Sequence, residues 1–162
     1  MFVYIARHAW AYEFGDPRWP DDMLRELEPD GADRYMQMVE ALAERGFAPE
    51  AVATSPYVRC LQTADIIAKY TSSQPEVTES SGLLPQSNLA ELIEWSRQTG
   101  CKKTCWVGHA PDVGIMTSAL IGDAHANIRF AKSAIAAVRF EDEIVPGAGE
   151  LYWHATAKSL GL

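Results

Sequence analysis

The sequence contains few cysteines and no long hydrophobic run. Three cysteines among 162 residues form an odd and sparse set, which argues against a disulfide framework. No cysteine or histidine pair completes a zinc site around Cys101 and Cys105. No apolar stretch approaches the roughly 18 residues of a membrane span, and the apolar run in MFVYIARH is too short for a signal peptide. We therefore expect a cytoplasmic protein that binds neither a membrane nor a metal ion.

Positive charge is also scarce. The chain has 14 lysines and arginines against 22 acidic residues, a net charge of −8. A broad basic face for nucleic acid is therefore not expected. Arginines that come together in such an acidic chain need a local reason, such as holding an anion. With 48% hydrophobic and 22% charged residues, the chain is typical of a globular protein, and its length predicts a single domain over residues 1–162.

Short apolar runs alternate with amphipathic segments along the chain. The predicted strands are Phe2 to Ile5, Ala51 to Thr54, Glu76 to Thr78, Thr104 to Val107, Ala134 to Phe140 and Glu150 to His154. Helices are predicted from Pro29 to near Gly46, after Pro56, around residues 89–93, and from Pro111 to about Leu120. This alternation predicts a mostly parallel sheet with helices on both faces, a three-layer α/β/α sandwich. The last two strands flank a Pro146-Gly147 turn, which favours an antiparallel addition at the C-terminal end.

A long irregular segment, residues 10–28, follows the first strand. Its prolines and glycine predict a loop, and long loops in compact domains are often functional. The aromatic side chains of this loop fit two interpretations. They form a rim that docks substrate, or they fold back on the core.

The predicted strands end in residues suited to bind an anion. Arg7 and His8 follow the first strand, and Arg59 lies in the helix after the second. If Ser55 is the N-cap and Pro56 the first helical residue, Arg59 is at the fourth position, in the first turn.

His109 and Ala110 follow the fourth strand and precede a helix that begins at Pro111. The free N–H groups near Ala110 are then a ready site for an anion. Because parallel strands end at one edge of the sheet, two arginines, two histidines and a helix N-terminus are expected to converge there. This set suits a phosphoryl group.

Three motifs resemble those of the histidine phosphatase superfamily, whose fold is that of cofactor-dependent phosphoglycerate mutase. They are Arg-His at 7–8, Thr-Ser-Pro-Tyr-Val-Arg-Cys-Leu-Gln-Thr-Ala at 54–64, and Gly-His-Ala-Pro-Asp at 108–112. The small size and the Ser-Ala-Ile-Ala stretch at 133–136 are most similar to the SixA branch, the protein phosphohistidine phosphatases. The motifs cover the core from residue 1 to about residue 120.

The resemblance implies a role for each matching residue. His8 would be the nucleophile that forms a phosphohistidine enzyme, which water then hydrolyses. Arg7, Arg59 and His109 would hold the phosphoryl oxygens. This agrees with the chemistry, since phosphoryl transfer needs mainly positioning and charge stabilisation, and no cofactor is expected.

The sequence departs from the family pattern at two points. Ala9 stands where the family usually has glycine after Arg-His, and this alters the pocket beside the nucleophile. The usual glutamic acid after the third strand has no clear match; its place falls near Ser81-Gly82, and Glu79 is the nearest carboxylate. Glu79 is therefore the candidate proton donor. An alkoxide leaves poorly without a proton donor, whereas imidazole leaves as a neutral base, so the departure favours phosphohistidine as substrate.

These observations predict a metal-independent phosphatase that acts on phosphohistidine of a partner protein, such as a histidine-phosphotransfer domain. Two alternatives stay open. One is a phosphomonoesterase of the same fold that acts on a small phosphate ester. The other is a catalytically weak module that binds phosphate or a partner, since Ala9 and the absent acid would both reduce turnover.

Overall fold

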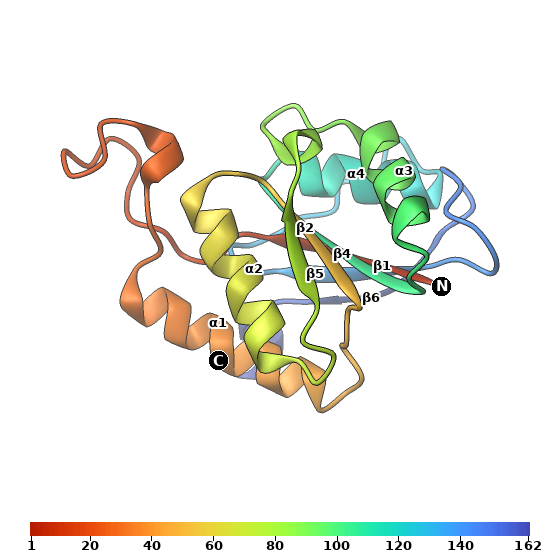
Figure 1. Cartoon of the computed structure of the whole chain (residues 1–162), viewed down its shortest axis with the longest axis horizontal. Helices are drawn as coiled ribbons and strands as arrows, with labels where there is room; N and C mark the ends of the chain where they lie inside the picture. Colours follow the sequence, from red (N-terminus) through yellow and green to blue (C-terminus); the bar gives the residue numbers. More distant parts are fainter.

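A computed structural model describes all 162 residues as one α/β/α sandwich (Figure 1). Its strands are β1 (Phe2–Arg7), β2 (Ala51–Thr54), β3 (Glu76–Glu79), β4 (Lys103–Gly108), β5 (Ile135–Arg139) and β6 (Glu150–Ala155). Its α-helices are α1 (Pro29–Ala43), α2 (Val58–Tyr70), α3 (Leu89–Thr99) and α4 (Asp112–Ile121). Three short 3₁₀ helices cover Asp22–Leu24, Ser81–Leu83 and Lys158–Leu160.

The six strands form one sheet in the order β3-β2-β4-β1-β5-β6. The strands β3, β2, β4 and β1 are parallel neighbours, whereas β5 pairs antiparallel with both β1 and β6. The predicted fold class, with its antiparallel C-terminal addition, is therefore confirmed.

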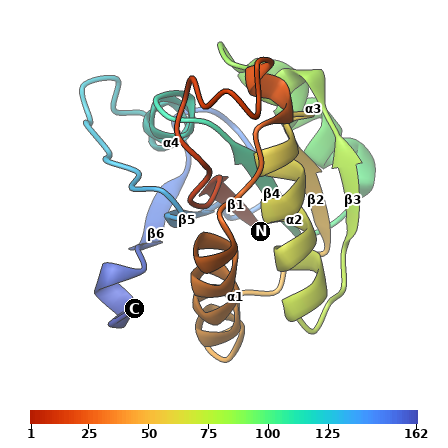
Figure 2. The ribbon, with the colours of Figure 1, turned by 90° about the vertical axis from the view of Figure 1, so that its left-hand side faces the viewer.

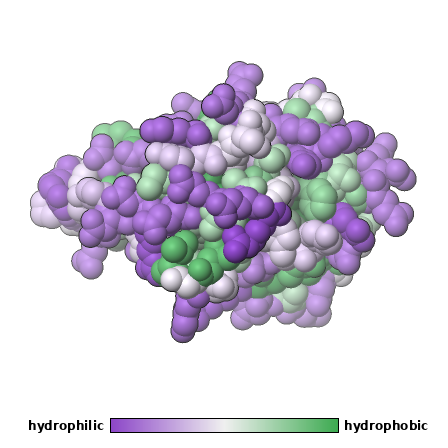
Figure 3. Space-filling view, turned by 90° about the horizontal axis from the view of Figure 1, so that it is seen from below, coloured by the Kyte–Doolittle hydropathy of each residue, from purple (hydrophilic) through white to green (hydrophobic).

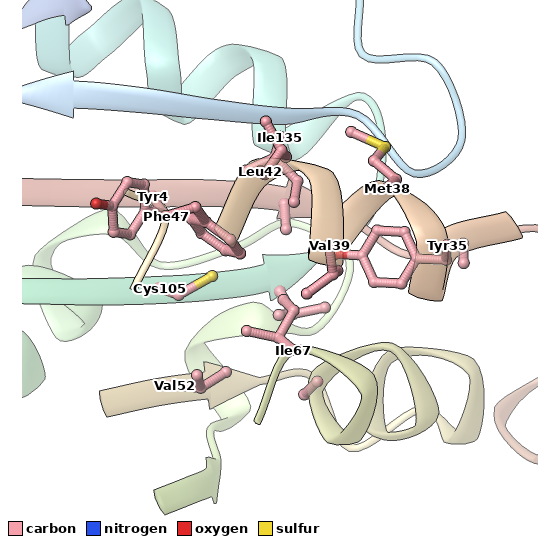
Figure 4. Close-up of a cluster of buried hydrophobic side chains, with 14 of the residues drawn as sticks. Tyr4, Tyr35, Met38, Val39, Leu42, Phe47, Val52, Ile67, Cys105 and Ile135 are labelled. Carbon is pink, nitrogen blue, oxygen red and sulfur yellow. The ribbon is translucent and has the colours of Figure 1, made fainter. Parts of the chain in front are cut away.

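Two hydrophobic clusters lie on opposite faces of the sheet. On one face α1 and α2 pack over side chains such as Tyr4, Val52 and Cys105, as Figure 4 shows. On the other face α3 and α4 cover Ile5, Trp106 and their neighbours. Successive residues of β1 and β4 therefore belong to alternate clusters, as the two-residue repeat of a strand requires. Figure 2 shows the two helical layers on either side of the strands.

The start of α2 differs from the prediction. Ser55 and Pro56 precede the helix, Tyr57 is the extended N-cap residue, and the first helical residue is Val58. Arg59 is therefore the second residue of the helix and not the fourth. The physical reason lies outside the helix. The Ser55 hydroxyl is 2.9 Å from His109 Nε2 but 3.5 Å from the Tyr57 amide, so its stronger hydrogen bond is to the residue after β4 and not to the helix.

The helix after β4 also begins slightly later than predicted. Pro111 is the N-cap residue of α4, and Asp112 is the first helical residue. The main-chain oxygen of His109 still accepts a hydrogen bond from the Val113 amide at 3.0 Å, so His109 is tied to the first turn of this helix.

The surface mixes hydrophilic residues with smaller hydrophobic patches, as Figure 3 shows for the face seen from below. None of the helices combines the length and the apolar character that crossing a bilayer requires. Phe14, at 82% exposed, and Ile115, at 61%, are the most exposed of the large hydrophobic residues.

Truncation of Ile67 is expected to destabilise the fold. Its side chain is fully buried where α2 meets α1 and the sheet, so Ile67→Ala leaves a cavity and costs about 2–5 kcal/mol of unfolding free energy. Urea unfolding measures this loss. The matched control is Ile115→Ala on the exposed face of α4, which should change stability by less than about 0.5 kcal/mol; similar losses for both variants would contradict the described packing.

Candidate active site

The ends of three parallel strands meet at one edge of the sheet. Arg7 of β1 is in register with Gly108 of β4, and Thr54 of β2 is in register with Val107. The pairing continues past the strands, since the His8 amide donates to the Gly108 carbonyl at 3.0 Å and the Ser55 amide donates to the Val107 carbonyl at 3.0 Å. The residues that follow each strand therefore lie beside one another.

His8 has a defined proton position. Its Nδ1 lies 2.8 Å from the main-chain oxygen of Ala9. Because a carbonyl oxygen can only accept, Nδ1 carries the proton, and Nε2 is left with its lone pair. Burial lowers the pKa of His8 to about 3, against the weaker opposing effect of the Ala9 bond. The imidazole is therefore neutral near pH 7, as a nucleophile must be.

The main-chain oxygen of Ala9 contacts His8, but its methyl group belongs to the core. Ala9 is fully buried within the core cluster beneath α1 and α2, and its amide donates to the Thr63 hydroxyl at 3.0 Å. The methyl group that replaces the usual hydrogen is thus accommodated by the core. This removes one reason for expecting a weak enzyme.

His109 lies next to His8, with 5.5 Å between the ring centroids. Its Nε2 is 2.9 Å from the Ser55 hydroxyl and its Nδ1 is 3.5 Å from Arg59 Nη2. Burial, followed by the charge of Arg59, lowers the pKa of His109 to about 4. The ring of Tyr57 packs edge-on against the imidazole, with centroids 4.9 Å apart.

Both arginines are held by main-chain oxygens. Arg7 Nη1 donates to the Phe130 carbonyl at 2.8 Å, and Arg59 Nη1 donates to the Asp22 carbonyl at 2.8 Å. The Nε atom of each arginine is buried and has no hydrogen-bond partner. Burial lowers the pKa of both guanidinium groups, yet arginine stays protonated in proteins. The site therefore holds two oriented positive charges with donors to spare.

Two residues of the long loop also reach the site. Asp22 Oδ2 lies 3.1 Å from Arg59 Nη2, and Asp22 Oδ1 lies 2.7 Å from Arg25 Nε. Neither residue belongs to the three sequence motifs at 7–8, 54–64 and 108–112. Their three-residue spacing on an irregular loop carries no signal, because the contact to Arg59 depends on how residues 10–28 fold over α2.

Glu79 and Ala110 are exposed, whereas the side chains of His8, Arg59 and His109 are buried. Glu79 is exposed at the end of the edge strand β3, in register with Thr54, and makes no hydrogen bond to the histidines or arginines of the site. Ala110 is exposed just before α4 and lines a groove of about 560 Å³ that runs along this helix to Phe130.

The aromatic residues of the long loop divide between the two interpretations. Trp10 packs against the core, whereas Tyr12 and Trp19 stack on each other at 4.6 Å with the Arg18 guanidinium over both rings. Phe14 projects into solvent at the tip of this loop.

Residues 3–83, half of the chain, match the model of the histidine phosphatase superfamily (branch 1). The chain belongs to the histidine phosphatase superfamily. The match includes Arg7, His8 and Arg59, whereas His109 lies beyond it and is placed at the site by the structure. Membership of this superfamily supports a phosphatase.

Relatives agree with the fold. The structure of the protein histidine phosphatase SixA complexed with tungstate superimposes with a TM-score of 0.84 over 99% of both chains, at 23% identity. A phosphoserine phosphatase from Entamoeba histolytica, in complex with 3-phosphoglyceric acid, has a TM-score of 0.66 over 96% of both chains, at 16% identity. An uncharacterized protein of Picosynechococcus sp. is 29% identical over 144 residues, which cover 86% of this chain and 85% of the relative.

Stability is expected to fall as the pH is lowered from 7 to 5. The pKa values of His8 and His109 are about 3 and about 4 in the fold, against about 6.5 in the unfolded chain. As the pH drops below 6.5 the unfolded chain therefore binds protons that the folded chain does not, and each histidine costs about 1–2 kcal/mol at pH 5. Urea unfolding at the two pH values measures the difference.

The variant His8→Gln isolates the contribution of His8. Glutamine does not titrate, so the loss between pH 7 and pH 5 should be smaller than in the wild type by about 1–2 kcal/mol. Equal losses in the two proteins would mean that the imidazole of His8 is not buried in its neutral form.

Proposed function

We propose that the protein is a phosphatase that passes the phosphoryl group through His8, and that its substrate is phosphohistidine on a partner protein. The observation that carries the proposal is the state of the His8 imidazole. It is neutral, and its Nδ1 proton is committed to the Ala9 carbonyl, so the lone pair of Nε2 is available to attack phosphorus.

The arginines would supply the charge that the transferring group needs. The guanidinium groups of Arg7 and Arg59 are anchored by main-chain oxygens and keep further donors for phosphoryl oxygens. His109, and the free amide groups near Ala110 at the start of α4, would bind the remaining oxygens. Donors that are fixed before the reaction stabilise the transition state without reorganisation.

Two displacements at phosphorus complete the reaction. In the first, His8 Nε2 bonds to phosphorus while the bond from phosphorus to the leaving nitrogen breaks. In the second, the oxygen of a water molecule bonds to phosphorus as the bond to Nε2 breaks, and the inorganic phosphate that is released carries the protons of the water or passes one to solvent. The nucleophile is thereby restored in its original protonation state.

The leaving group decides between substrates. Glu79 is exposed on an edge strand without a bond to the site, and the pKa of Asp22 is held below its usual value by Arg25 and Arg59, which outweigh the opposing effect of burial. Neither of these two carboxyl groups is thus an evident acid for an alkoxide, and the carboxylate of Glu91, near Gly82, accepts from the Gly82 amide at 2.9 Å and from the Ser80 and Ser81 hydroxyls. A phosphohistidine protonated on its other ring nitrogen leaves as neutral imidazole with a conjugate-acid pKa of about 6.5, so it needs no such acid.

The surroundings of the site favour a protein as the carrier of the phosphoryl group. A groove lined mainly by small and apolar residues adjoins the site at Ala110 and Pro111, and Phe14 stands exposed on the neighbouring loop. A small ester would use neither surface. The SixA structure of the same fold, which holds the oxyanion tungstate, belongs to a protein histidine phosphatase.

Replacement of His8 by alanine should abolish turnover. An aryl phosphate and a phosphorylated histidine-phosphotransfer domain serve as substrates, and released phosphate is measured. Arg59→Ala should weaken binding and rate together by about 2–4 kcal/mol, because one charged donor to the transferring group is lost. His125→Ala, in the exposed loop after α4, is the control and should leave turnover unchanged. Substantial activity in His8→Ala would refute the assignment of His8 as the nucleophile.

The rate should depend steeply on the leaving group. Without acid assistance, an alkyl phosphate such as glycerol phosphate should react at least 10²–10⁴-fold more slowly than phosphohistidine or an aryl phosphate, the usual range for this effect. Comparison of kcat/KM across such a panel tests this. Equal rates would favour the phosphomonoesterase alternative, and a loss of alkyl phosphate hydrolysis in Glu79→Gln would then identify Glu79 as the proton donor.

A further inference from the structure

Asp22 occupies the outer edge of the Arg59 guanidinium. Its main-chain oxygen accepts from Nη1 at 2.8 Å, and its carboxylate Oδ2 lies 3.1 Å from Nη2. The same Nη2 is 3.5 Å from His109 Nδ1, so this nitrogen faces both the loop and the imidazole pair. A phosphoryl group that uses Nη2 therefore meets the Asp22 carboxylate.

The carboxylate of Asp22 is held in place from its other side. Oδ1 accepts from Arg25 Nε at 2.7 Å, and Arg25 Nη1 donates to the Tyr12 carbonyl at 2.6 Å. Asp22 thus bridges two guanidinium groups, one on its own loop and one on α2. Partial burial raises its pKa, but the bonds and charges of Arg25 and Arg59 outweigh this effect and keep the pKa below its usual value.

The charge of the site depends on this carboxylate. Three guanidinium groups, those of Arg7, Arg25 and Arg59, lie in or next to it, whereas both histidines are neutral near pH 7. The carboxylates of Asp22 and Asp112 both act on His109 and offset part of this positive charge. Without Asp22 the site would have one more net positive charge, and would hold an anion more tightly.

We propose that the Asp22 carboxylate is an internal counter-anion of Arg59, which the substrate phosphoryl group displaces and which lowers the affinity of the site for inorganic phosphate. This inference rests on the proposed function of the same site. A different role, in which Asp22 only fastens the loop to α2, makes the opposite prediction: loss of the carboxylate would then loosen Arg59 and weaken phosphate binding.

Calorimetric titration of the full chain with inorganic phosphate tests the proposal. Asp22→Asn keeps the size of the side chain and a carbonyl that can accept from Arg59, but removes the charge. We expect the Kd for phosphate to fall about tenfold, because one repulsive unit charge close to the anion is lost. Asp22→Ala also removes the charge and should tighten binding as well, whereas Asp22→Glu restores a carboxylate and should bring the Kd back toward that of the wild type.

Asp21→Asn is the matched control. Asp21 lies on the same loop and accepts a hydrogen bond from the Met23 amide, a role that asparagine also fills. It makes no bond to Arg59, so the same loss of one negative charge should change the Kd by less than about twofold, since charges exposed to solvent are strongly screened. A fall as large as that of Asp22→Asn would overturn the proposal by attributing the effect to net charge.

The outcomes separate the two levels of the hypothesis. Tighter phosphate binding in both Asp22→Asn and Asp22→Ala supports the counter-anion. Unchanged or weaker binding in these variants, with clear binding by the wild type, overturns it and leaves the proposed function standing. No phosphate binding by the wild type or any variant at millimolar concentration would overturn the anion site itself, and the counter-anion with it.

Discussion

The site depends on the register of three parallel strands. Arg7 is opposite Gly108, and Thr54 is opposite Val107, so the residues beyond β1, β2 and β4 meet at one edge of the sheet. A slip of one residue in any strand would turn its side chains to the other face. The two hydrophobic clusters prevent such a slip, because each face of β1 and β4 is buried under its own pair of helices. The geometry of the site is thus set by the core.

Burial also sets the electrostatics of the site. The imidazoles of His8 and His109 lie where a charge would be poorly solvated, and their pKa values fall well below that of histidine in water. The arginines cannot respond in the same way, so their charges persist and are balanced by carbonyl oxygens and by Asp22. One environment therefore gives a neutral imidazole beside permanent cations, the combination that the proposed transfer of a phosphoryl group to His8 requires.

Local patterns in the sequence predicted the strands, the helices and the convergence of Arg7, His8, Arg59 and His109 on one edge. These features depend on periodicity and on the direction of parallel strands, which neighbouring residues specify. The role of Ser55 could not be predicted this way. A serine before a proline is a good N-cap by local rules, and its hydroxyl instead pairs with His109, a residue 54 positions away. Asp22 was missed for the same reason, since its partner Arg59 is 37 residues distant.

The exposed position of Glu79, without a bond to the site, and the proposed role of Asp22 as a counter-anion are consistent with one chemical problem. Under the proposed mechanism the leaving imidazole departs without a proton from the enzyme, so the step at phosphorus does not require a carboxylic acid in the site. A carboxylate there is then free to serve another purpose. Inorganic phosphate is the product whatever the substrate, and a site with surplus positive charge would retain it. Because Asp22 is tied to Arg25 on its own loop, under the proposal it would stay close while a phosphoryl group is bound and return to Arg59 when phosphate leaves. A carboxylate whose pKa Arg25 and Arg59 keep below its usual value is poorly suited to donate a proton, and under the proposal it would instead promote release of the product.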